Sequence, residues 1–466
     1  MARENGTTRR PDGWQLLAAA LLLAGCTVPE PPFVAERGST AAMPSPRDAA
    51  GSTDATAVTA TATASPSAAA ASPLRPPPPV GTVTLIDGLR VLRMRGSPRE
   101  LGFQHGNAFA AEIKEGFTAF VLGYRCHGIR ARYAQIAKRV EHEIEFPPEL
   151  LEELDGMIEG MRASGADLTL PLLRRPIERA DLLVLNTLDH WGLFGCSGFT
   201  AWGAATDDGE VLVARNFDFD VDQPDGAIAR LNVVLAFEPD GGVPFVSLAF
   251  PGLVGIATGF SARGVGAFLH VGNGAFGGGE IGLTRPLMAI TRQLIEKCGS
   301  VDAAPRAREL LTDARIRNSF LLRLTTDGIG APPTTVFEID PLGVVEQTLP
   351  DALRGEQELL LTTNHFTTGK MTFPAIPDSK IRWCALEDAA REALASGDHR
   401  IDPAEAQKAL TRVAQHVGNV TLHALVWRPK TGEIWLDVSD QVDGRIAAAT
   451  SGKWRTLHLA ELLATD

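Results

Sequence analysis

Apolar and polar residues recur with regular periods over most of the chain, and the period changes along it. Residues 102–117 and 148–161 place apolar side chains three and four positions apart, which predicts two amphipathic helices. Residues 83–92 are largely apolar with polar interruptions, a pattern typical of one long strand or a pair of strands. The stretch 182–188 is apolar and leads to a glycine-rich segment around Cys196, where we expect a turn.

After Cys196, short apolar or alternating runs are separated by turns that contain Gly and Asp, which is typical of antiparallel hairpins. Strands are expected at residues 199–204, 211–214, 229–237, 243–249, 264–271, 319–325, 335–340, 358–363, 421–428 and 433–438. Helical blocks are expected at residues 285–298, 303–314, 381–395 and 403–416. Runs of strands that alternate with runs of helices predict an α+β fold, with helices packed on stacked antiparallel sheets.

The first 25 residues have the features of a processing segment. They begin with several arginines and continue with an apolar run, 16–23, that is too short to span a bilayer as a helix. The run ends in Leu23-Ala24-Gly25-Cys26, which resembles the bacterial lipobox. The resemblance implies a lipoprotein signal peptide over 1–25, lipidation of Cys26, and a chain anchored at the bacterial cell envelope, facing the periplasm or exterior. The alternative is an ordinary signal peptide with a chance cysteine.

Residues 26–81 are rich in Ala, Pro, Ser and Thr and nearly free of aromatic residues. Such a stretch buries too little surface to offset its ordering entropy, so it predicts a disordered tether. The folded hydrolase domain is expected to begin at residue 82. We divide it into an N-terminal part, 82–195, and a C-terminal part, 196–466.

Composition narrows the function classes. The 466 residues are 44% hydrophobic and carry a net charge of −12, so a large core is possible and no basic face for nucleic acid is visible. The five cysteines, at positions 26, 126, 196, 298 and 384, include no CxxC pair, which argues against a zinc site. We therefore expect no metal and no cofactor. The oligomeric state is left open by the sequence.

The candidate chemistry lies in a predicted hairpin that starts at Cys196. Its second strand returns through Arg215 and Asp218, so both side chains could come close to the thiol. An odd offset places two residues of a strand on opposite faces, and we therefore expect the strand to end or bulge between them.

Four ordered motifs carry a family resemblance. They are Gly96-Ser97-Pro98-Arg99-Glu100-Leu101-Gly102-Phe103-Gln104-His105-Gly106, Cys196-Ser197, Arg215-Asn216-Phe217-Asp218 and Thr363-Asn364-His365-Phe366. Over roughly residues 90–440 the chain resembles the penicillin acyltransferase group (peptidase C45) of self-processing cysteine amidohydrolases, which is related to the choloylglycine hydrolases.

The resemblance implies a four-layer αββα sandwich and cleavage of the Gly195–Cys196 bond by the chain itself. Cleavage would leave Cys196 with a free α-amino group, whose reference pKa of roughly 7.7–8 lets it accept the thiol proton. We expect Gly195 to favour cleavage because glycine tolerates a strained backbone most easily. The implied substrate is a small N-acylated molecule, and its acyl group passes to water or to an amine.

The resemblance also assigns roles by position. Asp218 orients the new amine, Arg215 favours the thiolate, and the Asn364 side chain donates to an oxyanion hole. Ser379-Lys380-Ile381-Arg382 resembles a later Ser-x-x-Arg segment, which makes Arg382 a structural arginine of the site.

One departure from the family leaves alternatives open. Choloylglycine hydrolases carry an asparagine near the position of Ser261. Either Ser261 or a backbone N–H takes the donor role, or the oxyanion hole is built differently, and bile-salt specificity is in doubt. A second hypothesis is a binding lipoprotein that has kept the fold and lost the activity. A third is a papain-like cysteine peptidase in which His365 serves Cys196.

Overall fold

The computed structural model describes residues 81–464, apart from 192–193, 222–225, 276–282, 348–357, 369–374, 398 and 443–444. The predicted signal peptide, Cys26 and the tether up to residue 80 lie outside the described residues. Within the described part, no helix combines the length and the apolar character needed to cross a bilayer.

A nine-stranded sheet forms one of the two central layers. In spatial order its strands are β1 (Thr82–Ile86), β2 (Leu89–Gly96), β7 (Val233–Pro239), β8 (Phe245–Ala249), β9 (Thr258–Ser261), β10 (Gly266–Val271), β11 (Phe320–Thr325), β12 (Thr334–Asp340) and β13 (Gly343–Glu346). All neighbours are antiparallel except β2 and β7, which pair in parallel. The predicted strand pair at 83–92 is the β1–β2 hairpin, and β2 joins the N-terminal part to the C-terminal part in one sheet.

The second central layer contains the Cys196 hairpin. Its strands are β14 (Leu359–Thr362), β5 (Phe194–Ala201), β6 (Leu212–Asp220), β16 (Asn419–Trp427), β17 (Glu433–Val438) and β20 (Arg455–His458), and β15 (His416–Val417) pairs with β16. Two small hairpins lie apart, β3 (Thr169–Leu170) with β4 (Arg175–Pro176) and β18 (Asp440–Val442) with β19 (Arg445–Ala447).

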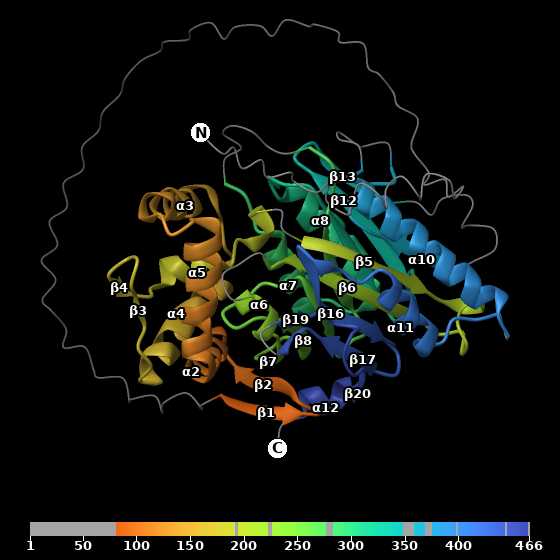
Figure 1. The fold of residues 1–466 in the computed structure, drawn as a ribbon, viewed down its shortest axis with the longest axis horizontal. Coiled ribbons are helices and arrows are strands. Elements are labelled where there is room, and N and C mark those ends of the chain that lie inside the picture. Colours follow the sequence, from red (N-terminus) through yellow and green to blue (C-terminus); the bar gives the residue numbers. More distant parts are fainter. Residues whose placement is uncertain are drawn as a thin grey trace, which may run out of the picture.

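Helices cover the outer faces of both sheets (Figure 1). Helices α10 (Pro377–Ala395) and α11 (Pro403–Arg412) lie on the second sheet, and α7 (Leu287–Lys297) and α8 (Ser300–Asp313) lie on the first. An N-terminal block contains α2 (Pro98–Gly116), η1 (Phe117–Arg125), α3 (Arg130–Glu143), α4 (Pro148–Ala163) and α5 (Arg179–Leu185). The short helices are η2 (Leu188–Trp191), η3 (Gly203–Ala205), α6 (Ala227–Arg230) and α12 (Leu459–Leu463). The predicted four-layer αββα arrangement is confirmed.

The layers are held by separate apolar clusters. Between the sheets, Val213, Phe260, Phe268 and Trp427 are fully buried, and the rings of Phe260 and Trp427 stack with centroids 4.8 Å apart. On the helix side of the second sheet, Trp383 of α10 belongs to another buried cluster. Successive side chains of a strand point to opposite faces of the sheet, so alternate residues pack in different apolar clusters.

Glycines let helices α2 and α4 touch backbone to backbone. A Cβ atom at Gly102 would lie 1.7 Å from the Glu153 carbonyl oxygen, and one at Gly106 would lie 2.0 Å from the Met157 oxygen. The opposing glycines of α4, Gly156 and Gly160, would each place a Cβ 2.0 Å from a carbonyl oxygen of α2. Any side chain at these positions would therefore push the helices apart.

The same contact explains the first motif of the family resemblance. Gly102 and Gly106 end that motif, and Glu100 within it accepts hydrogen bonds from the main-chain N–H and the hydroxyl of Ser97, at 2.9 and 2.6 Å. These contacts form the start of α2. The motif thus builds a helix pair and supplies no group to the chemistry around Cys196.

The expected turn at Cys196 is wrong. Cys196 is the third residue of strand β5, and the apolar stretch 182–188 forms the end of α5 and the start of η2. Helix α3 was not predicted because only Tyr133 and Val140 of its 14 residues are buried, which leaves no apolar stripe in the sequence.

Candidate active site

Cys196 is fully buried at the beginning of β5, and its thiol faces the other sheet. Its Sγ lies 3.3 Å from the carbonyl oxygen of Leu269 in β10. Phe217 pairs with Cys196 across the hairpin, and paired side chains share a face of the sheet. The thiol therefore points into the layer between the two sheets.

Arg215 of β6 lies next to this thiol. Its Nη2 is 3.4 Å from Cys196 Sγ and donates to the Leu269 carbonyl at 2.8 Å. Burial raises the pKa of Cys196 to about 11, and the positive charge of Arg215 acts in the opposite direction. The protonated thiol is therefore the favoured form of Cys196 at neutral pH in this structure.

Asp218 approaches Cys196 from the other face of the sheet. It pairs with Gly195, its Oδ1 accepts a hydrogen bond from the Thr421 hydroxyl at 2.7 Å, and its Oδ2 lies 3.8 Å from Arg382 Nη1. Burial raises the pKa of the Asp218 carboxyl group.

The expectation that the returning strand ends or bulges between Arg215 and Asp218 is wrong. Strand β6 continues to Asp220, and its pairing with β5 is regular. The irregularity lies in the neighbouring strand β16, whose register shifts between Thr421 and His423, opposite Asp218 and Phe217. The two side chains lie on opposite faces, and both reach Cys196 because they approach it from opposite sides: Arg215 beside the thiol, Asp218 beside the preceding peptide bond.

Asn364 and Arg382 hold the main chain of Cys196. The Cys196 N–H donates to Asn364 Oδ1 at 2.8 Å, and Arg382 Nη1 donates to the Cys196 carbonyl at 2.5 Å. Arg382 Nη2 also donates to Asn364 Oδ1 at 2.8 Å, and Asn364 Nδ2 donates to the Val271 carbonyl at 2.8 Å. In the uncleaved chain Asn364 thus presents an acceptor to Cys196, and its role as an oxyanion donor stays a prediction.

The site includes residues that the motifs did not name. Asp378 accepts from Arg382 Nε at 2.9 Å. Ser379, which the Ser-x-x-Arg motif did name, accepts through its hydroxyl from the Asn364 N–H at 2.8 Å. The i,i+4 spacing of Asp378 and Arg382 gave no signal, because the predicted helix began at residue 381 and left Asp378 outside it. Thr421, which binds Asp218, comes from β16, and nothing local in the sequence marks it.

His365 forms no pair with Cys196. Its Nδ1 lies 2.8 Å from the Ser379 hydroxyl and 3.1 Å from that of Thr363, and neither ring nitrogen contacts the thiol. Burial lowers the pKa of His365 to about 4. The arrangement that a papain-like mechanism requires is therefore not present among the described residues.

Gly195 has no strained backbone of the kind we expected. It is not among the glycines with positive φ. A Cβ atom at this position would lie 3.1 Å from Asp218 Cβ and 3.4 Å from Asn419 Nδ2. The absence of a side chain at Gly195 therefore lets Asp218 lie close to the Gly195–Cys196 bond.

Ser261 lies away from the thiol. It ends β9 at the tight turn into β10, where its N–H donates to the Val265 carbonyl at 2.8 Å. Leu269, which contacts Cys196, lies four residues after Val265, about 13 Å farther along the sheet at the usual rise. Ser261 is therefore not a donor to this site, and that part of the expectation is wrong.

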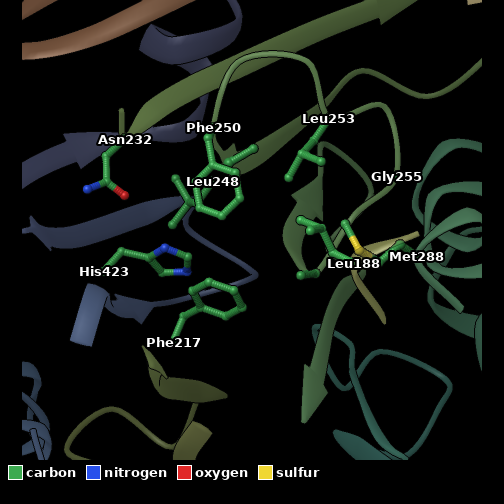
Figure 2. Close-up of a pocket in the computed structure, with 11 residues that line it drawn as sticks. Leu188, Phe217, Asn232, Leu248, Phe250, Leu253, Gly255, Met288 and His423 are labelled. Atoms are coloured by element: carbon green, nitrogen blue, oxygen red, sulfur yellow. The ribbon is translucent and has the colours of Figure 1, made fainter. Parts of the chain in front are cut away.

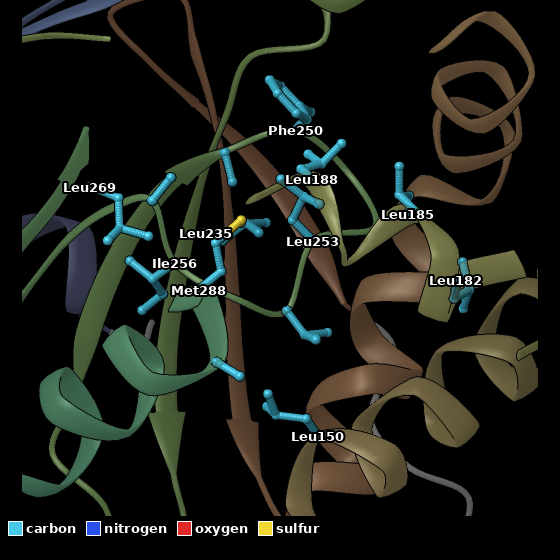
Figure 3. Close-up of a cluster of buried hydrophobic side chains, with 14 of the residues drawn as sticks. Leu150, Leu182, Leu185, Leu188, Leu235, Phe250, Leu253, Ile256, Leu269 and Met288 are labelled. Carbon is cyan, nitrogen blue, oxygen red and sulfur yellow. The ribbon is translucent and has the colours of Figure 1, made fainter. Parts of the chain in front are cut away.

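A small apolar cavity lies beside Phe217, the pairing partner of Cys196. Its volume is about 10 Å³, room for a single water molecule. In Figure 2 the rings of Phe217 and His423 lie parallel at one side of it, with centroids 4.8 Å apart, and Leu188, Leu253 and Met288 lie at the other. Figure 3 shows Leu188, Leu253 and Met288 within a larger buried cluster. The described residues contain no group of His, Cys, Asp and Glu that could hold a metal ion.

Comparison with known proteins gives distant matches. No family model matches the chain. It is 28% identical over 207 residues, 38% of its length, to an uncharacterized protein of Archaeoglobus fulgidus, and it spans about a third (32%) of that relative.

Three of the similar solved structures carry enzyme names. The Caenorhabditis elegans ortholog of N-acylethanolamine-hydrolyzing acid amidase has a TM-score of 0.37 at 15% identity, with 50% of this chain and 93% of that chain covered. A mutant conjugated bile acid hydrolase from Clostridium perfringens has a TM-score of 0.36 at 12% identity, covering 58% and 95%. Penicillin V acylase from Agrobacterium tumefaciens has a TM-score of 0.35 at 12% identity, covering 52% and 83%. At these TM-scores the likenesses decide nothing about the chain, whose fold is defined by its own sheets and helices.

Proposed function

We propose that this chain is a self-processing cysteine amidohydrolase or acyltransferase of the N-terminal-nucleophile type, with Cys196 as nucleophile. One observation carries the proposal: each polar group of Cys196 has its own partner. The N–H is held by Asn364, the carbonyl by Arg382 and the thiol by Arg215. A cysteine with a merely structural role needs no such set of buried polar partners.

The first step proposed is cleavage of the Gly195–Cys196 peptide bond. Cys196 Sγ attacks the Gly195 carbonyl carbon, the C–N bond breaks, and the thiol proton ends on the Cys196 nitrogen. Water then hydrolyses the thioester, which releases a carboxylate on Gly195 and restores the thiol. Asp218 supports this step, because its carboxyl group lies beside the bond and its Oδ2 has no hydrogen-bond partner among the described residues.

Cleavage would give the mature enzyme its base. The Cys196 nitrogen becomes an α-amine that is already placed against Asn364 Oδ1, with Asp218 on the same side. The amine takes the thiol proton, sulfur attacks the substrate carbonyl, and the proton passes to the leaving nitrogen. Water then releases the acyl group, or a second amine accepts it. Arg215 favours the thiolate throughout.

The proposed substrate class is a small N-acyl amide, as the motif resemblance implies. Asn364 would join the oxyanion hole only after its amide turns away from the Val271 carbonyl, which is where its Nδ2 donates in the uncleaved chain. A panel of N-acyl amino acids, acyl lactams and bile-salt conjugates distinguishes the acyl preferences. A chain that is cleaved but hydrolyses none of them would favour the binding-lipoprotein hypothesis.

The proposal predicts that the purified wild-type protein contains two polypeptides that remain together. Intact-mass spectrometry should detect both, and N-terminal sequencing of the C-terminal one should begin with Cys196-Ser197-Gly198. A single uncleaved polypeptide, after incubation at neutral pH, would rule out the mature-amine mechanism.

We also propose that acyl chains on Cys26 attach the enzyme to a membrane. Replacement of Cys26 by serine in a bacterial host should move the protein from the membrane fraction to the soluble fraction, because one residue would carry the whole anchor. Cleavage at Cys196 should be unaffected, since Cys26 has no part in the chemistry. Unchanged fractionation of Cys26→Ser would disprove lipidation.

A further inference from the structure

A second buried arginine, Arg323 of β11, faces the Cys196 hairpin from the other sheet. It is fully buried, like Arg215, and it pairs with Phe268 across β10 and β11. Its Nη2 donates to the Ala214 carbonyl at 2.8 Å. The contact therefore fixes the main chain of β6 at the residue directly before Arg215.

The two guanidinium groups share one aromatic ring. The centre of the Arg215 guanidinium lies 5.6 Å from the Phe268 ring centroid, and that of Arg323 lies 5.1 Å from it. Both distances are within the range of cation–π attraction, which is strongest where water is excluded. Phe268 therefore links the two charges across the gap between the sheets.

Neither arginine has a carboxylate ion-pair partner among the described residues. Nε and Nη1 of each also have no hydrogen-bond acceptor there. Burial lowers the pKa of both groups, yet an arginine keeps its proton in proteins. Two buried cations without a carboxylate ion-pair partner in one dry layer are costly, and the Cys196 thiol, 3.4 Å from Arg215, interacts electrostatically with both of them.

Gly198 makes the approach of Arg323 possible. A Cβ atom there would lie 2.9 Å from Arg323 Nη2 and 2.2 Å from the Ala214 carbonyl oxygen, the two atoms that form the hydrogen bond. The glycine two residues after the nucleophile is thus required by the contact between the sheets.

We propose that Arg323 is a positioning residue of the Cys196 site. From the facing sheet it fixes the strand that carries Arg215 and adds a second buried positive charge, and together these favour the Cys196 thiolate. The inference rests on the proposed function only in treating the Cys196 thiolate as the reactive form. The effect of Arg323 on thiolate formation can be measured without any catalysis.

A test of Arg323 must leave the other charged and titratable groups around the Cys196 thiol unchanged. They are Arg215 and Asp218 of β6, Arg382 and Asp378 of α10, His270 of β10 and His423 of β16. Burial lowers the pKa of both histidines well below its usual value, so they stay neutral around pH 7. No variant below replaces any of these groups.

The test is a thiolate titration. Ultraviolet absorbance of the thiolate is recorded against pH, and the curve of the same protein carrying Cys196→Ala is subtracted, so that only Cys196 contributes. Arg323→Gln keeps an N–H donor for the Ala214 carbonyl and removes the charge, whereas Arg323→Lys keeps the charge. We expect Arg323→Gln to raise the Cys196 midpoint by roughly one unit, about tenfold less thiolate at neutral pH, and Arg323→Lys to restore most of it.

The matched control is Arg292→Gln. Arg292 is also a buried arginine over aromatic rings, but it pairs with Glu153 and Glu296 and does not contact Cys196. It should lower the melting temperature and leave the Cys196 midpoint unchanged. Coincident curves for wild type, Arg323→Gln and Arg323→Lys would overturn the proposal. The titration is equally valid on a chain that never cleaves, so failure of the proposed function is seen separately, by mass spectrometry.

Discussion

Replacement of Cys196 by alanine should leave the protein as one uncleaved polypeptide with no hydrolase activity. The substitution removes the only atom that can attack the Gly195 carbonyl in the proposed step. It should scarcely affect folding, because Sγ has two polar contacts, to Leu269 and Arg215, and the site keeps its hydrogen bonds to the Cys196 main chain. Denaturing gels and intact-mass spectrometry measure cleavage, and hydrolysis of an N-acyl substrate measures activity.

The chain offers matched controls in its other buried thiols. Cys126 and Cys298 are free and buried, and neither contacts the site. Alanine at either position should leave cleavage complete and activity close to wild type. Two fragments from Cys196→Ala would show that the thiol does not cut the chain.

Alanine at Gly106 or Gly160 should strongly destabilise the protein. Each added Cβ would lie 2.0 Å from a main-chain oxygen of the partner helix, and neither α2 nor α4 can yield locally at a backbone atom. We expect a loss of roughly 3 kcal/mol in the free energy of unfolding, the upper end for overpacking of a core. Chemical denaturation followed by circular dichroism measures it.

Gly116 is the control within the same helix. A Cβ there would lie 3.4 Å from Leu231 Cδ1, which is an acceptable contact. Gly116→Ala should therefore be neutral or stabilise α2 by up to about 1 kcal/mol, through the better helix propensity of alanine. Equal destabilisation by Gly106→Ala and Gly116→Ala would contradict the close helix contact as the reason for the glycines.

Much of the fold was predictable because the elements that flank the site have strong periods. The β5–β6 hairpin, α10 and α11 were all predicted, but β5 begins at Phe194 and not at residue 199, and α10 begins at Pro377 and not at residue 381. The parallel pair of β2 with β7 was not predictable, because the two strands are far apart in sequence and each has the same pattern in either orientation.

Most residues of the candidate site could be predicted from the sequence, but their arrangement around Cys196 could not. The order of the motifs selected Cys196, Asp218 and Asn364, which the fold brings together. It did not show that Arg215 and Asp218 reach the cysteine from opposite faces, since that depends on which layer each face meets. Arg323 and Thr421 come from other strands, and only the tertiary contacts place them near the site.

The parallel pairing of β2 with β7 would have a consequence for the protein after the cleavage that we propose. Arg93 of β2 also donates to the Leu462 carbonyl of α12 at 3.1 Å. Strand β2 of the first polypeptide would therefore contact both β7 and α12 of the second. The two products of cleavage could separate only if the hydrogen bonds between β2 and β7, within one continuous sheet, were broken. Unfolding would therefore be irreversible, because refolding would require two separate polypeptides to associate and form the sheet again without the peptide bond that once joined them. The lifetime of the proposed two-chain form would then be set by the barrier to opening that sheet.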